Sequence, residues 1–313
     1  MRKKSALKTE DLVWSTIGHE FQKLVLEKSL KSGRLPHAWI FSGSRNVGKT
    51  SLALDFAKIL LCNSFERSRP CGDCNNCRSV KGGHPDMIVV DQEGEITVDQ
   101  IRRLQRQFVL KSFMANAKVA VISSAENLNQ EAANAFLKLL EEPTSKTHFI
   151  LTTSNLDRIL PTVLSRCQKL FFGLSGASDF ARFSTAHVEG RDSAMQGAVA
   201  MSYGRLGLLR RLMIHPEFAE QWIASLALLR QLLSCDLSEK LKISQELAGR
   251  EGEEIDLVLF SWLLAAETRL LASQSNAEAV REGERAKAVW EAAEHLRLNL
   301  NTRLVFDNLV LQI

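Results

Sequence analysis

The sequence predicts a parallel α/β domain followed by a largely helical second half. In the first half, short β-type runs alternate with amphipathic helical stretches, which is typical of a parallel sheet covered by helices. A complete phosphate-loop motif lies between the first predicted strand and the helix after it, as phosphate binding requires. From residue 215 onward the chain is rich in Leu, Ala, Glu, Arg and Gln, a composition that favours a bundle of long helices.

Five segments have the apolar and β-branched content of buried strands, and together they predict a five-stranded parallel sheet. They are residues 37–41, 87–91, 118–123, 148–153 and 168–172. Between them the spacing predicts helices over 50–61 and 129–143, the second of which is stopped by Pro143. Thr97 and Gln100 form a capping box that opens a further helix.

The 313 residues exceed what one hydrophobic core usually serves, so more than one domain is expected. The alternation of strand and helix patterns stops after Phe172, and this change predicts an α/β domain over 1–172. Short helices are expected over 173–214, where Gly204 and Gly207 mark a turn, and long helices over 215–313.

The net charge of +4 results from 40 basic and 36 acidic residues. A protein that wraps nucleic acid alone is usually more basic, so any DNA contact is expected to be local or shared with partners. The N-terminal segment has no apolar core of signal-peptide length, and no apolar run approaches the roughly 20 residues that span a bilayer. The sequence therefore predicts a cytoplasmic protein without membrane contact.

Residues 43–50 form a complete G-x-x-x-x-G-K-T motif, consisting of Gly43, Ser44, Arg45, Asn46, Val47, Gly48, Lys49 and Thr50. In such a loop the backbone N–H groups converge on phosphates, the lysine neutralises the outer phosphates, and the threonine hydroxyl binds Mg²⁺. The motif predicts a site for ATP or ADP. A relict loop that no longer binds nucleotide is the alternative.

Hydrolysis also needs an acidic pair at the end of a neighbouring strand, one acid holding Mg²⁺ and the other polarising the attacking water. Where these acids should follow the apolar run of the third strand, this chain has Ser123 and Ser124, and the nearest acid, Glu126, lies two residues past Ser124. Loss of the water-polarising carboxylate removes a contribution of roughly 10²–10⁴ in rate. The sequence therefore predicts an ATPase activity that is absent or very weak.

Four of the six cysteines lie within residues 62–77, at Cys62, Cys71, Cys74 and Cys77. In a reducing compartment this C-x₈-C-x₂-C-x₂-C spacing indicates a metal site rather than disulfides. Four thiolates with no open position describe a structural Zn²⁺ site. Four free thiols are the alternative, whereas a redox role is disfavoured because the run has no isolated pair of nucleophilic and resolving thiols.

Together these segments resemble the AAA+ subunits of the bacterial DNA polymerase III clamp loader. The resemblance covers Ser15 to Phe172 and rests on five features: STIGHE at 15–20, GRLPHAWIFSGSRNVGKTSLA at 33–53, the cysteine spacing, ANAFLKLLEEP at 133–143 and SRC at 165–167. Beyond Phe172 only the architecture is similar, and it implies a helical lid over 173–214 and a helical collar over 215–313 that mediates oligomerisation.

In the motor subunits of this family, gamma and tau, the third strand ends in an intact acidic pair. Ser123 and Ser124 at these positions imply the stationary delta-prime type, and segment 204–207 has glycine where motors place a phosphate-sensing arginine. The implied partners are gamma/tau and delta subunits, the sliding clamp and primer–template DNA. The alternative is an active motor in which Glu126 or another acid replaces the missing pair.

The resemblance also implies roles for two arginines. The SRC arginine, here Arg166, would reach the γ-phosphate of a neighbouring motor subunit in trans, where a guanidinium stabilises transferring charge. Arg102 matches a helix that tracks the DNA backbone. The simpler alternatives are a helix-capping arginine and a solvated helix face. A zinc-module nucleic-acid binder unconnected to replication is disfavoured, because the cysteine cluster lies inside the α/β domain and lacks the flanking residues that such modules use to read nucleic acid.

Overall fold

The computed structural model describes most of the chain, namely residues 12–64, 68–91, 94–109, 112–115, 117–143, 146–176, 178, 180–181, 183, 193–202 and 204–313. The chain forms two compact units. The first comprises Met1–Ser175 with Arg205–Gly207, and the second comprises Gly176–Gly204 with Leu208–Ile313. The division of the chain into three domains stays a prediction.

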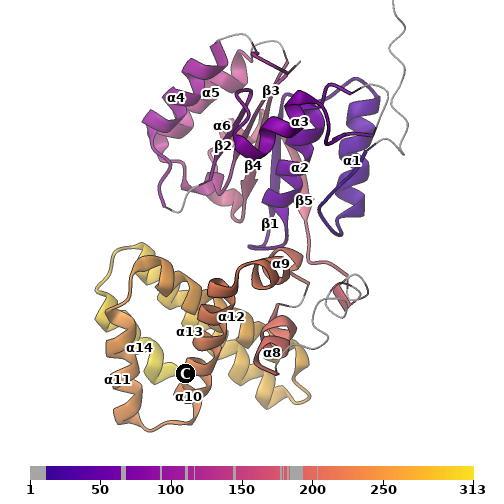
Figure 1. The fold of residues 1–313 in the computed structure, drawn as a ribbon. Coiled ribbons are helices and arrows are strands. Elements are labelled where there is room, and N and C mark those ends of the chain that lie inside the picture. Colours follow the sequence, from indigo (N-terminus) through magenta and orange to yellow (C-terminus); the bar gives the residue numbers. More distant parts are fainter. Residues whose placement is uncertain are drawn as a thin grey trace, which may run out of the picture. The chain divides into compact units, whose positions relative to one another are not determined.

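A five-stranded parallel sheet forms the centre of the first unit, within the part of the chain that is described (Figure 1). Its strands are β1 Ala38–Gly43, β2 Met87–Val90, β3 Lys118–Ile122, β4 Thr147–Thr153 and β5 Gln168–Phe172. They lie in the order β2-β3-β4-β1-β5, and every neighbouring pair is parallel. The expected parallel α/β fold is confirmed.

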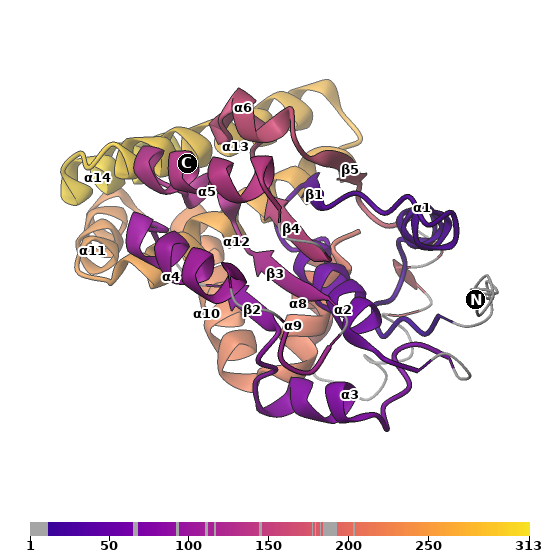
Figure 2. The same cartoon turned by 90° about the horizontal axis from the view of Figure 1, so that it is seen from above.

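Helices cover both faces of this sheet, as the two views show (Figures 1 and 2). They are α1 Glu20–Lys31, α2 Lys49–Leu61, α4 Val98–Val109, α5 Gln130–Glu141 and α6 Pro161–Leu164. Successive strand residues point to opposite faces, so Ile40 packs with the buried residues of α4, α5 and α6, whereas Trp39 and Phe41 pack with those of α1 and α2. Burial on both faces explains the continuous apolar runs of the strands.

Local capping explains where two of these helices begin. The side chain of Gln100 accepts a hydrogen bond from the Thr97 N–H at 2.8 Å, which confirms this half of the expected capping box. At the start of α5, Asn129 Oδ1 accepts from the Ala132 N–H at 2.8 Å. Short turns follow β3 and β4, and they are η3 Ala125–Asn127 and η4 Leu156–Arg158.

The remaining elements of the described chain are helices. They are α3 Asn75–Ser79 with η2 Val80–Gly82 in the cysteine insertion, then α8 Ser193–Met201, α9 Leu206–Ile214, α10 Pro216–Ser234, α11 Leu237–Ala248, α12 Gly252–Ala272, α13 Asn276–Arg297 and α14 Thr302–Gln312. Gly204 has the positive φ of a turn, but Gly207 is the second residue of α9, so the expected turn does not include it. None of the described helices is long and apolar enough to cross a membrane.

The second unit has its own core, in which Trp222 and Trp262 are fully buried. The Trp262 indole N–H donates to the Ser225 carbonyl oxygen at 2.9 Å. The Ser225 and Ser261 hydroxyls lie 2.6 Å apart and pair α10 with α12. These contacts satisfy polar groups that would otherwise be costly to bury.

Candidate functional site

The phosphate loop links the carboxyl end of β1 to the amino end of α2, and glycines are required along it. Gly43 has a φ of 148°, and a Cβ there would lie 2.0 Å from the Phe172 carbonyl oxygen. Gly48 has a φ of 116°. In the same unit, a Cβ on Gly207 would lie 2.5 Å from the Asn46 carbonyl oxygen. Larger residues at these positions would strain the loop or displace its neighbours.

Lys49 is folded back onto the phosphate loop. Its ammonium donates to the carbonyl oxygens of Gly43 at 2.7 Å and Ser44 at 2.6 Å, and the residue is only 8% exposed. Burial lowers the pKa of Lys49 to about 8, against the opposing effect of the Glu126 charge. The loop therefore holds a partly desolvated cation that a phosphate could neutralise.

Hydroxyl groups occupy the end of β3 beside the phosphate loop. The Thr152 hydroxyl accepts from the Ser124 N–H at 3.3 Å and lies 3.5 Å from the Thr50 hydroxyl, the group expected to bind Mg²⁺. Ser123 is buried at 3% exposure. Ser124 is thus linked to Thr50 through the Thr152 hydroxyl, and neither Ser123 nor Ser124 offers a carboxylate.

Glu126 lies closer to the site than its distance along the sequence suggested. The η3 turn directs its carboxylate to Ser154, whose backbone N–H donates to Oε1 at 3.0 Å and whose hydroxyl donates to the same oxygen. Burial raises the pKa of Glu126, but these hydrogen bonds outweigh it and hold the pKa below its ordinary value. Glu126 is therefore ionised and acts on Lys49 through its charge, while its hydrogen bonds go to Ser154.

Asp55 was missed in the sequence, although it anchors the 15–20 segment beside the phosphate loop. Its carboxylate accepts from the backbone N–H and hydroxyl groups of both Ser15 and Thr16, at 2.6 to 2.9 Å. His19 then places Nε2 2.8 Å from the Val47 carbonyl oxygen. The signal in the sequence that could have identified Asp55 is its position next to Phe56, on the buried face of α2.

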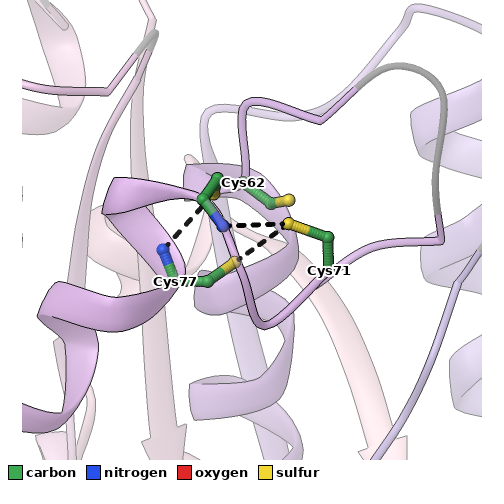
Figure 3. A group of neighbouring side chains, drawn as sticks. Cys62, Cys71 and Cys77 are labelled. Carbon is green, nitrogen blue, oxygen red and sulfur yellow. Dashed lines mark hydrogen bonds between the residues drawn. The ribbon is translucent and has the colours of Figure 1, made fainter.

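The four predicted metal ligands converge in the structure. Their Sγ atoms all lie within 4.8 Å of one another, and Figure 3 shows the side chains of Cys62, Cys71 and Cys77 turned together. A tetrahedral zinc site with metal–sulfur bonds of about 2.3 Å has sulfur–sulfur edges of about 3.8 Å. The Cys71 and Cys77 sulfurs are 4.0 Å apart. The cluster therefore fits a four-coordinate metal ion after a small contraction.

Three elements supply these ligands. Cys62 caps the C-terminus of α2, Cys71 lies in the following loop, and Cys74 caps the N-terminus of α3. The Cys74 N–H donates to the Cys71 sulfur, and the Cys77 N–H donates to the Cys74 sulfur, each at 3.4 Å. Burial raises the pKa of Cys74, but hydrogen bonds from Cys77 and neighbouring groups outweigh it and lower the pKa to about 6. Such bonds stabilise the thiolate that a metal requires.

Arg166 lies between α6 and β5 and makes contacts with two helices. Its Nη1 donates to the Thr162 carbonyl oxygen at 2.9 Å and to the Ser165 hydroxyl at 3.2 Å. The contact with Thr162 is the one expected of a helix-capping arginine, the alternative to a role in trans. Its Nη2 lies 2.7 Å from Glu141 Oε1 at the end of α5. The side chain remains 36% exposed.

The parallel sheet separates Arg166 from its own phosphate loop. Arg166 precedes β5, at the amino edge of the sheet, whereas the loop follows β1, at the carboxyl edge. A strand of five residues is about 16 Å long, at about 3.3 Å per residue. Arg166 therefore lies at the edge of the sheet opposite its own phosphate loop.

Arg102 lies on the exposed face of α4 with Arg103 and Arg106. Its Nη1 is 3.6 Å from Asp99 Oδ1, and both side chains are largely exposed. The opposite face of α4 is buried through Ile101, Leu104 and Phe108. The basic face is thus available for contacts while the helix is held firmly.

The fold and the phosphate loop define a P-loop protein of the AAA+ class. The sequence model of the family described as DNA polymerase III, delta subunit, matches residues 18–174. The chain is 30% identical over 281 residues to DNA polymerase III subunit delta' of Pseudomonas aeruginosa, covering 75% of this chain and 86% of that protein. The chain therefore belongs to the DNA polymerase III clamp-loader family, which contains delta' and tau/gamma subunits.

A tau/gamma subunit and a gamma subunit-related protein are also similar to this chain. DNA polymerase III subunit tau/gamma of Haemophilus influenzae is 38% identical over 152 residues, which is 48% of this chain but only 22% of that protein. A gamma subunit-related protein of Thermotoga maritima has a similar fold, with a TM-score of 0.50 and 17% identity over 93% of this chain and 97% of that one. That likeness supports the fold alone.

Proposed function

We propose that the chain is the stationary, non-hydrolysing delta-prime subunit of a DNA polymerase III clamp loader, helping to load the sliding clamp onto primed DNA. The observation that carries this proposal is that Ser123 and Ser124 directly follow β3, where hydrolysis needs carboxylates. A serine hydroxyl is too weak a base to polarise the attacking water. Binding of ATP or ADP in the 43–50 loop, with Mg²⁺ at Thr50, is part of the proposal.

Within the complex, Arg166 is proposed to act in trans as the arginine finger of a neighbouring gamma/tau subunit. Its position at the opposite edge of the sheet from the phosphate loop supports this role. Its exposure supports it as well, because a finger must reach a phosphate outside its own chain.

Two further contacts belong to the proposal. Zn²⁺ is the proposed occupant of the cysteine cluster, since four thiolates without an open position are typical of structural zinc. Arg102 is proposed to contact the backbone of primer–template DNA, supported by the exposed basic face of α4. Delta and gamma/tau subunits and the sliding clamp are the proposed protein partners.

An active motor is the second candidate function, because the charge of Glu126 acts on Lys49 of an intact loop. A steady-state ATPase assay on the purified chain, with and without primed DNA and clamp, separates the two. The stationary subunit is expected to show no turnover above that of Lys49→Ala. Robust turnover that is lost in both Lys49→Ala and Glu126→Gln would show an active motor and contradict the proposal.

A further inference from the structure

We propose that Glu141 is a positioning residue for Arg166: it holds the guanidinium in the orientation from which it meets the neighbouring phosphate. This inference rests on the proposed role of Arg166 as a finger. Glu141 belongs to the 133–143 segment, whose pattern by itself indicates no role for this side chain.

The geometry holds the two terminal nitrogens of Arg166 from two directions. On one side, Nη1 bonds the carbonyl oxygen of Thr162 and the hydroxyl of Ser165, both belonging to α6 and its C-terminus. On the other side, Nη2 lies 2.7 Å from the carboxylate of Glu141, the last residue of α5. A guanidinium is planar, so contacts at both terminal nitrogens define its plane.

Helix stability does not account for an acid at this position. Glu141 stands at the C-terminal end of α5, where the helix dipole disfavours a negative charge. Its side chain is 49% exposed, and an exposed ion pair contributes little to folding. Among the described residues, the Glu141 carboxylate forms an ion pair with the Arg166 guanidinium.

An ion pair that contributes little to folding is suited to a positioning role. A guanidinium carries five N–H donors, so Arg166 can keep its contact with Glu141 while other donors turn to a phosphate. Fixing the side chain beforehand removes ordering that the transition state would otherwise require. Removal of the carboxylate should therefore slow the step that uses Arg166 without changing how the neighbour binds ATP.

The chain provides a matched control in Glu142. It is the adjacent residue, also an exposed acid, and no side-chain partner is recorded for it among the described residues. Glu141→Gln and Glu142→Gln therefore remove the same charge from the same helix end, but only Glu141→Gln removes it from Arg166.

The test is a double-mutant cycle in the complete clamp loader, assembled from this chain with its tau/gamma and delta subunits. The ATPase stimulated by clamp and primed DNA is measured, giving kcat and KM for ATP separately. Arg166→Ala is expected to cause the largest loss of kcat, and Glu141→Gln a loss of about twofold or more with KM unchanged. Glu142→Gln should match the wild type, and Glu141→Gln should add nothing to Arg166→Ala.

The outcomes separate the two proposals. Wild-type rates with Arg166→Ala would contradict the proposed role of Arg166 as an arginine finger in trans. A clear loss with Arg166→Ala but wild-type rates with Glu141→Gln would overturn the positioning role alone. A further loss when Glu141→Gln is added to Arg166→Ala would overturn it too, because Glu141 would then act through other groups. Equal melting temperatures of the isolated variants confirm that each is folded.

Discussion

At the scale of the residue, the environment of Lys49 determines how this site should respond to pH. The ammonium is buried against two carbonyl oxygens of its own loop, and burial brings its pKa from 10.5 to about 8. A bound phosphate favours the charged form and raises this pKa again. We therefore expect the proposed nucleotide binding to be coupled to protonation of Lys49 in the alkaline range.

We predict that ADP binding weakens as the pH rises through about 8. Below this pH the free lysine is already protonated and the affinity is at its full value. Above it the chain must take up a proton to bind, so the affinity falls by up to about tenfold per pH unit. Titration calorimetry at several pH values measures this slope, and Lys49→Arg should flatten it because arginine stays charged. Parallel profiles for the two proteins would rule out Lys49 as the group responsible.

At the scale of the element, the cysteine insertion depends on a small number of local contacts. It includes the five-residue helix α3, whose Asn76 side-chain amide donates to the Leu61 carbonyl oxygen at 2.7 Å. The Arg69 carbonyl oxygen also accepts from the Val13 N–H at 2.7 Å. So short a helix is not stable by itself. A metal ion held by all four sulfurs would supply the missing stability.

We predict one equivalent of Zn²⁺ per chain, measured by elemental analysis of protein purified without added metal. Cys71→Ser should lose most of the metal and expose the insertion to proteolysis, because three ligands hold the ion less tightly than four. Cys235→Ser is the matched control, as this thiol is half-buried in the second unit and distant in sequence from the cluster. A metal content near zero, together with four reactive thiols at 62–77, would contradict the zinc assignment.

At the scale of the whole molecule, the chain combines an α/β unit with a helical unit that has a separate core. The α/β unit carries the phosphate loop, the cysteine cluster and both arginines. The helical unit leaves several large apolar side chains of α13 and α14 exposed, among them Trp290, Leu304 and Leu311. Such side chains are suited to contacts between subunits.

We predict that the chain co-purifies with tau/gamma and delta subunits as one hetero-oligomer. Light scattering coupled to size-exclusion chromatography gives the mass and stoichiometry. Arg166→Ala should assemble as the wild type does, because removal of one exposed arginine changes little buried surface. Elution of the chain by itself from an equimolar mixture would contradict its role as a clamp-loader subunit.

The sequence alone was sufficient to predict the parallel sheet and the family, and its motifs also indicate the groups that we propose to carry chemistry. The phosphate loop and the C-x₂-C steps are short motifs whose geometry depends on neighbouring residues, so they can be recognised without the fold. The serines at 123 and 124 are informative for the same reason, since they occupy a position defined relative to a strand.

Tertiary structure decided which distant residues act on these motifs. Asp55 binds residues 40 and 39 positions earlier, Glu126 binds Ser154 28 positions later, and Glu141 reaches Arg166 across the gap between α5 and α6. No local pattern records such pairs, because they depend on the order of strands and on which edge of the sheet each loop occupies. The parallel arrangement of β1 and β5 likewise places Arg166 at the edge opposite the phosphate loop, since parallel strands begin at one edge and end at the other.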